Sequence, residues 1–133
     1  MAEVWKMSEA ASLGFHAIAA LSVNSDRLLS TGEIALRLKV SEAHLSKVLQ
    51  RLARAGLVRA VRGPGGGFRL GRESDRITLL EVYEAIEGPL NPTDCLFSTP
   101  ICGGHRCILG GLLKKGNREI RSYLEKTRLS HLG

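Results

Sequence analysis

Apolar positions in the first part of the chain predict three helices in close succession. From Ser8 to about Asn24 they recur at three- and four-residue steps, which is the pattern of one buried helix face. Ser30 and Glu33 have the spacing of a capping box and predict the start of a short second helix. Ser41 can cap a third helix, and Gly56 fits its left-handed end. Two helices separated by a short break have the helix-turn-helix pattern.

The segment after the third helix predicts a β-hairpin. Residues 58–62 read as a strand, the glycine-rich stretch 63–67 as a tight reversal, and residues 68–70 as the returning strand. A hairpin in this position is the wing of a winged helix-turn-helix. Thr78 and Glu81 then repeat the capping-box spacing and predict a fourth helix.

The last third of the chain combines an irregular segment with a final helix. Residues 89–107, the cysteine segment, contain three of the four prolines and all three cysteines. A helical stripe runs from about Ile108 to the end, interrupted only by Gly116 and Asn117. Alone, such a helix has no place to bury its stripe, so we expect it to pair with a second copy in a homodimer. Packing against the first helix is the alternative.

These elements predict a mainly α fold with a small β-hairpin wing. We expect a winged helix-turn-helix domain over residues 1–88, a cofactor loop over 89–107 and a dimerisation helix over 108–133. No stretch approaches the roughly 18 consecutive apolar residues of a membrane span, and no export signal is evident, so we expect a cytoplasmic protein without membrane contact.

Charge is concentrated where the helix-turn-helix lies. Residues 37–72 hold nine Lys or Arg and a single acid, a net charge of +8, whereas the whole chain carries +6. Such a basic block suits a polyanion partner, because neutralised phosphates release condensed counterions. A solvated basic face is the alternative on charge alone.

The outward-facing residues of the third helix are the first candidates for DNA contact. Those near the helix start are best placed to reach base edges in the major groove, and Arg51 and Arg54 to reach phosphate. The candidates for base reading are Ala43, His44, Ser46 and Lys47. The alternative is an ordinary exposed polar face.

The wing supplies a second set of candidates. Arg59 and Arg62 alternate with Val58 and Val61, and we expect both arginines to project from one side towards phosphate or a narrow minor groove. Residues 65–67, including Gly65 and Gly66, would let the backbone approach a sugar-phosphate. This glycine run is not a nucleotide-binding loop, because it lacks the Gly-Lys-Ser ending and precedes a strand.

Cys95, Cys102 and Cys107 have the spacing C-x6-C-x4-C. Three soft ligands this close suit iron-sulfur or zinc, but both centres usually have four protein donors. His105 is the simplest fourth ligand for zinc. For a cluster, Glu9 or Ser12 could reach from the first helix of a neighbouring subunit. The alternatives for the cysteines are a structural role and a redox-reactive thiol without metal. For the whole protein they are a thiol-based or zinc-binding, redox-responsive DNA-binding regulator, and a metal- or thiol-binding protein without DNA function. No catalytic constellation is present, so we do not expect an enzyme.

The segments LSKVLQRLARAGLVRAVRGPGGGFRL and ITLLEVYEAIEG resemble the Rrf-two (Rrf2) family of bacterial winged-helix regulators, the group that contains IscR and NsrR. The resemblance implies a homodimer that crosses its C-terminal helices and binds palindromic double-stranded DNA. It also implies an iron-sulfur cluster held by the three cysteines, major-groove contact by Ser41 to Lys47, and wing contact by Arg59 and Arg62.

Two departures from the family pattern concern the cluster. Members of the IscR type carry a histidine three residues after the last cysteine, where this chain has Gly110. Members of the NsrR type use an acid on the first helix, where this chain has Ser12, with Glu9 one turn earlier. Both a 2Fe-2S and a 4Fe-4S cluster therefore remain open.

Overall fold

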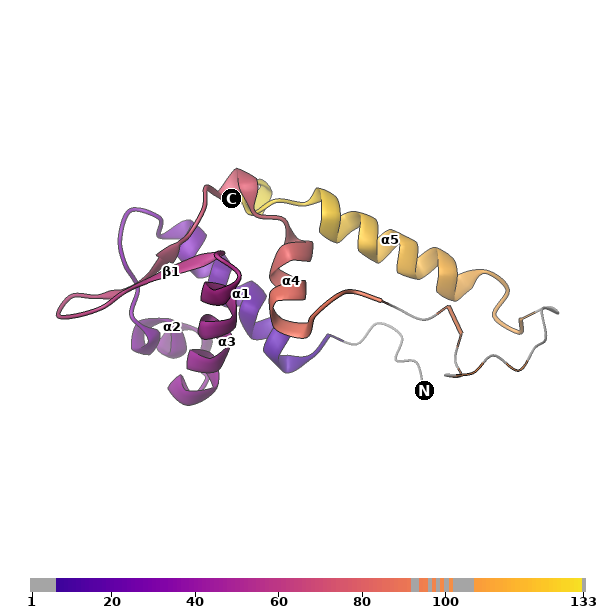
Figure 1. The fold of residues 1–133 in the computed structure, drawn as a ribbon, viewed down its shortest axis with the longest axis horizontal. Coiled ribbons are helices and arrows are strands. Elements are labelled where there is room, and N and C mark those ends of the chain that lie inside the picture. The colour runs from indigo at the N-terminus through magenta and orange to yellow at the C-terminus, as the bar shows by residue number, and fades with distance from the viewer. Residues whose placement is uncertain are drawn as a thin grey trace.

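The computed structural model describes residues 7–91, 94, 95, 97, 99, 101 and 107–132. The expected fold class is confirmed: the described chain is mainly helical, with one two-stranded antiparallel sheet (Figure 1). The elements are α1 Glu9–Val23, α2 Thr31–Leu38, α3 Glu42–Arg54, β1 Val58–Val61, β2 Gly67–Leu70, the 3-10 turn η1 Ser74–Arg76, α4 Leu79–Glu87, α5 Leu112–Lys126 and the 3-10 turn η2 Leu129–Leu132.

Side-chain caps begin the first four helices at the predicted residues. Ser8, Ser30, Ser41 and Thr78 each accept a hydrogen bond from a backbone N–H of the first helical turn, at 3.0–3.2 Å. Ser30 and Thr78 complete capping boxes with the glutamates three residues later. These bonds satisfy donors that a helix start otherwise leaves unpaired, and they fix where each helix begins.

One apolar core joins α1, α2, α3 and α4. The stripe predicted for α3 is buried as expected. Gly14 lets α1 approach α4 closely, because a Cβ at this position would lie 3.0 Å from Cγ1 of Ile86. The largest fully buried side chains of the described residues are Ile18, Leu21, Leu29, Ile34, Leu45, Leu49, Leu52, Leu57, Ile77, Leu129, Val48 and Val82.

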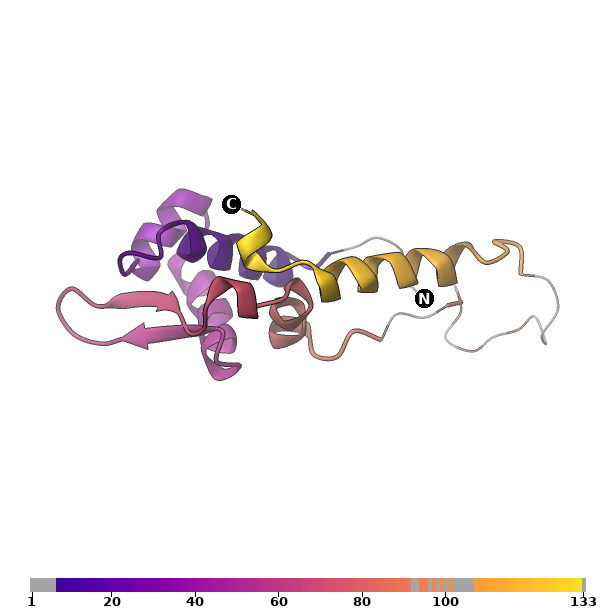
Figure 2. The same ribbon diagram turned by 90° about the horizontal axis from the view of Figure 1, so that it is seen from above.

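The wing, formed by β1, β2 and the turn between them, projects from one end of the molecule (Figures 1 and 2). Its register pairs Val58 with Leu70 and Val61 with Gly67. Its base is anchored to the segment before α2, because Leu29 and Phe68 exchange two backbone hydrogen bonds of 3.0 and 2.7 Å. The wing is therefore fixed at its base and extended at its tip.

The expected helix from Ile108 to the end of the chain is wrong at both ends. Residues 108–111 form a turn, and α5 runs from Leu112 to Lys126 without a break at Gly116. Beyond α5 the backbone pairs with the segment before α4, since Leu129 donates to the carbonyl of Ile77 and Leu79 to that of Thr127, both at 3.0 Å. This pairing ends the helix.

The C-terminal segment also packs partly on its own chain. α5 packs against α4 (Figure 2), and η2 packs against α1. Leu124 and Leu129 are buried in the shared core, whereas Leu112 and Tyr123 on α5 are 57% and 59% exposed. Within the described residues, no helix has the length and apolar character needed to cross a membrane.

Candidate nucleic-acid interface and cysteine segment

The start of α3 presents the residues predicted for base reading at an accessible surface. Ser41, Ala43 and Lys47 are exposed, and His44 and Ser46 are half-buried. The Ser41 hydroxyl accepts from His44 N at 3.2 Å as the helix cap. A hydroxyl that accepts can still donate, so the cap leaves Ser41 one proton for a DNA acceptor.

His44 joins the start of α3 to the start of α1. Its Nδ1 lies 3.9 Å from Oε1 of Glu9, an ion pair when the imidazole is protonated. Ser8, next to Glu9, donates a hydrogen bond from its hydroxyl to Glu87 at the end of α4. The starts of α1 and α3 and the end of α4 therefore meet at one place.

Arg51 has a structural contact in addition to its predicted role at phosphate. Its Nη1 donates to the carbonyl oxygen of Ile86 at 3.0 Å, in the last turn of α4. A cation at this end of a helix is favoured by the partial negative charge of the unpaired carbonyls. Arg54, one turn's length further along α3, is exposed.

The two predicted wing arginines do not share a strand face. β1 ends at Val61, so Arg62 lies in the turn and strand alternation does not place it beside Arg59. The residue directly opposite Arg59 is Arg69 on β2. Two like charges at directly opposed positions repel each other unless an anion lies between them, which favours a phosphate partner.

Sequence reasoning missed Arg69, although a signal for it was present. Counting symmetrically outward from the glycine turn pairs position 59 with position 69. The same count shows that Arg59 and Arg62, three residues apart, face opposite sides of an extended strand.

The wing glycines are required by the turn itself. A Cβ at Gly66 would lie 2.2 Å from the carbonyl oxygen of Val61, and one at Gly67 would lie 2.7 Å from that of Leu29. Gly65 has a positive φ of 73°, and a Cβ added to it would have no atom within 4 Å. Of the two glycines predicted to meet DNA, only Gly65 has open space on its side-chain side.

Two of the three predicted cysteine ligands lie in the described residues. Cys95 and Cys107 are both half-buried, and the backbone N–H of Phe97 donates to Sγ of Cys95 at 3.5 Å. Cys102 and His105 lie outside the described residues. Among those that are described, no three His, Cys, Asp or Glu side chains come together as a metal site.

The cysteine segment is attached to both helices that flank it. Leu90 N donates to Oε2 of Glu84 on α4 at 2.8 Å, and Arg121 of α5 donates to the Leu90 carbonyl at 2.8 Å. Asn117 of α5 donates to Oδ1 of Asp94 at 3.3 Å. The position of the segment therefore depends on both α4 and α5.

The proposed fourth ligands on α1, Glu9 and Ser12, have contacts of their own within α1 and with α3. Glu9 is exposed and faces His44, and Ser12 is half-buried. The carbonyl of Ser12 is 2.7 Å from Nδ1 of His16. The start of α5, which follows Cys107, lies at the end of the molecule opposite the wing (Figure 1).

Comparison with known proteins decides the family. The family model Rrf2, described as "Iron-dependent Transcriptional regulator", matches residues 7–133. The chain is a member of the Rrf2 family. The family is one of transcriptional regulators.

Several regulators of this family are similar to the chain in sequence. The putative HTH-type transcriptional regulator BadM of Rhodopseudomonas palustris is 40% identical over 82 residues, covering 62% of the chain and 53% of BadM. The HTH-type transcriptional regulator IscR of Xenorhabdus nematophila is 36% identical over 100 residues, covering 75% of the chain and 61% of IscR. The Rrf2 chain thus spans less than two thirds of the length of these two relatives.

Solved Rrf2-type structures match the whole fold. CymR, the global cysteine regulator of B. subtilis, superposes with a TM-score of 0.81 at 27% identity, covering 97% of this chain and 96% of CymR. IscR of T. potens superposes with a TM-score of 0.75 at 26% identity, covering 96% of this chain and 85% of IscR. Both matches include the wing and α5 as well as the helix-turn-helix, because each covers nearly all of this chain.

Proposed function

We propose that this Rrf2 protein is a homodimer that binds a palindromic operator in double-stranded DNA and whose affinity is controlled by an iron-sulfur cluster. Cys95, Cys102 and Cys107 would hold the cluster. The observation that carries the proposal is the placement of all three cysteines in the single segment that joins α4 to α5. α4 in turn contacts the recognition helix α3 through Arg51 and Ile86.

The donor set fits such a group. Thiolates are the usual ligands of iron-sulfur clusters, and backbone N–H donors to the sulfur atoms tune them. Cys95 has one such donor in Phe97. Gly110, with a φ of 59°, turns the chain shortly after Cys107. When bound, the cluster would supply an oxidant-sensitive link among the three cysteines.

The fourth coordination position distinguishes the possible centres. His105 is the simplest donor for zinc, and Glu9 or Ser12 of a second copy for a cluster. If the fourth ligand comes from a second copy of the chain, the centre would be complete only in the dimer. The description of the family as iron-dependent supports the cluster over zinc.

The DNA interface combines α3 and the wing. The start of α3 would read bases, and Arg51 and Arg54 would contact phosphate. Arg59 and Arg62 on the wing would contact phosphate or the minor groove. The residues proposed for α3 base reading are Ser41, Ala43, His44, Ser46 and Lys47, and Gly65 and Gly66 would allow close approach of the wing backbone.

The experiment measures operator affinity with and without the cluster. Protein is purified without oxygen, its visible absorption and its iron and sulfide contents are measured, and DNA affinity is compared before and after cluster removal. We expect equal amounts of iron and sulfide and a change in affinity on removal. Cys102→Ala should abolish that change, whereas Thr99→Ala in the same segment should not. Equal DNA binding by the loaded and cluster-free wild type would disprove the proposal.

The second candidate keeps the DNA binding and makes the cysteines thiol or zinc sensors. The structural match to CymR covers nearly the whole chain, and the description of that protein names cysteine rather than iron, which supports a signal other than a cluster. The same anaerobic preparation decides between the two candidates. Iron-free protein whose DNA affinity responds to an oxidant and recovers with a thiol reductant indicates thiol sensing, and stoichiometric zinc indicates a zinc centre.

A further inference from the structure

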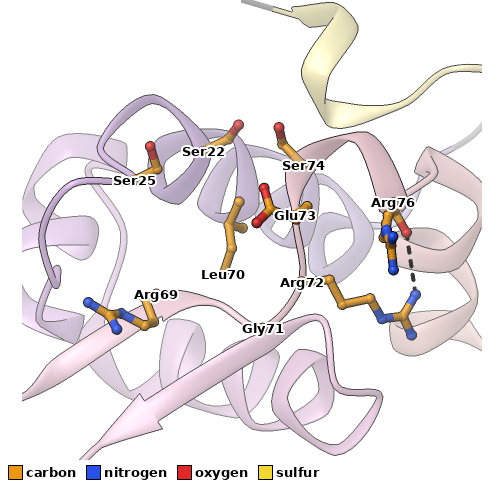
Figure 3. A pocket seen from close by; sticks show the side chains of 9 residues that line it. All are labelled: Ser22, Ser25, Arg69, Leu70, Gly71, Arg72, Glu73, Ser74 and Arg76. Atoms are coloured by element: carbon orange, nitrogen blue, oxygen red, sulfur yellow. Dashed lines mark hydrogen bonds between the residues drawn. The ribbon is translucent and has the colours of Figure 1, made fainter.

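A polar pocket of about 810 Å³ lies at the base of the wing. The end of α1, the end of β2 and η1 surround it (Figure 3). Its volume is within the roughly 300–1,000 Å³ of small-molecule sites. The cysteines do not line it. Arg69, which lies opposite Arg59 on the wing, does line it, so the pocket adjoins the proposed DNA-binding surface but is separate from the cysteine segment.

One of the three lining arginines is already neutralised. Arg72 forms an ion pair with Glu81 of α4 and donates to the carbonyl oxygens of Ala55 and Arg76, at 3.4 and 3.5 Å. These contacts use the guanidinium of Arg72 for bonds within the protein. Arg72 therefore holds β2, η1 and α4 together and is not a candidate for binding a ligand.

The other three charged side chains of the pocket form no such contacts with the protein. Arg69, Glu73 and Arg76 have no side-chain hydrogen bond or ion pair anywhere in the described chain. Figure 3 shows the Glu73 carboxylate between the two arginines, which lie on opposite sides of the pocket. Hydroxyls of Ser22, Ser25 and Ser74 line the remaining edge.

We propose that this pocket binds a small metabolite in which an ammonium group lies between two carboxylates. The carboxylates would meet Arg69 and Arg76, since guanidinium is suited to bind carboxylate through paired hydrogen bonds. The ammonium would meet Glu73. No aromatic side chain lines the pocket, so it offers no stacking surface for a nucleobase.

Such a ligand would act on the wing. Arg69 belongs to β2, and Ser22 belongs to α1, so an occupant bridges the wing and the body of the domain. β2 also packs against α1 directly, and the ligand would add to that contact. The proposal does not depend on the cluster, because none of its residues lies in the cysteine segment.

The test is calorimetric titration of the full chain with L-glutamate as probe. Glutarate lacks the ammonium and L-glutamine lacks the second carboxylate, so each removes one proposed contact. We expect saturable binding of L-glutamate that is about tenfold tighter than binding of either comparator, the effect of about 1.4 kcal/mol. Absence of L-glutamate binding at millimolar concentration, or equal binding of glutarate, overturns the proposal.

Two variants assign the contacts. Arg76→Gln should weaken binding of both L-glutamate and glutarate by about tenfold. Glu73→Gln should reverse the preference between the two ligands: binding of L-glutamate should become weaker and binding of glutarate stronger. The controls are Arg118→Gln and Glu119→Gln on the exposed side of α5, which make the same charge changes away from the pocket. They should alter binding of neither L-glutamate nor glutarate.

DNA affinity provides the last control. Operator affinity is measured for Arg76→Gln and Arg59→Gln without added metabolite. If both substitutions weaken it equally, the pocket arginines contact DNA phosphate. That result also overturns the proposal. Unchanged operator binding together with lost L-glutamate binding supports it.

Discussion

The guanidinium of Arg51 donates a 3.0 Å hydrogen bond to the carbonyl oxygen of Ile86, 35 residues later in the chain. The bond joins the outer face of α3 to the last turn of α4. Since the cysteine segment begins two residues after α4 ends, a displacement of that segment would reach α3 through this contact. The bond is therefore the most direct described connection between the proposed sensor and the DNA-binding surface.

Arg51→Ala should destabilise the fold more than Arg54→Ala. Both arginines lie in the last turn of α3, so both substitutions remove the same favourable charge from that helix end. Only Arg51 bonds Ile86, and a hydrogen bond with a charged donor is worth about 1.5–3 kcal/mol. We expect urea unfolding to show an additional loss of about 1–2 kcal/mol for Arg51→Ala. Equal losses would show that the bond adds nothing to stability.

Lys47→Ala should relax sequence discrimination. A side chain that reads a base edge contributes about 1–3 kcal/mol of discrimination, whereas a phosphate contact weakens all sequences uniformly. We expect Lys47→Ala to weaken operator binding but leave competitor DNA almost unaffected. Arg54→Ala should weaken both and lower the salt dependence by about one ion. Lys114→Ala on α5 serves as the control, and a uniform loss for Lys47→Ala would assign it to phosphate instead.

Short-range spacing was enough to predict how α1 to α4 begin. Ser30 with Glu33, and Thr78 with Glu81, act within one helical turn, so the sequence alone contains both partners. The burial of the α3 stripe follows from its period for the same reason. Structural features whose interacting residues lie within a few positions of each other can therefore be predicted from the sequence alone.

Contacts between distant segments were not predictable in this way. α5 ends at Lys126 because the chain beyond it pairs with residues 77–79, about fifty positions earlier. Arg51 meets Ile86 only after α3 and α4 pack. At the cysteine segment, the sequence supplies the ligand types, but Cys102 and His105 lie outside the described residues, so that prediction stays untested.

The fourth helix should become less stable in acid through Glu81. Burial opposes ionisation of this carboxyl, but the hydrogen bonds and charge from Arg72 and the bonds from Thr78 outweigh it, so the pKa lies below its usual value. Because the folded-state pKa is depressed, the stabilisation is present above the unfolded-state pKa and is lost as pH falls through the folded-state pKa.

Glu81→Gln tests this contribution, since glutamine keeps the capping-box geometry but not the charge. The pair with Arg72 is more than a third exposed, so we expect a loss of only about 0.5–1 kcal/mol at neutral pH. The difference from wild type should shrink in denaturant unfolding as pH falls below about 4. Glu119→Gln should show no such difference, and a loss that persists in acid would assign the effect to packing.

The wing glycines can be separated by substitution. Gly66→Ala should disrupt the turn, because its Cβ would lie 2.2 Å from the carbonyl oxygen of Val61. Gly65 has room for a side chain, and its φ of 73° is one that asparagine tolerates. Gly65→Asn should therefore fold normally, with its thermal midpoint close to that of wild type.

If the DNA backbone approaches the wing at Gly65, Gly65→Asn should weaken operator binding by roughly tenfold, the effect of about 1.4 kcal/mol. Gly56→Asn is the matched control, because Gly56 also has a left-handed φ, 76°, and open space around its Cβ position, but lies outside the wing turn. Fluorescence anisotropy with an operator duplex measures both variants. Equal affinities for the two variants would mean that Gly65 serves only the turn, and that the wing contacts DNA through its arginines alone.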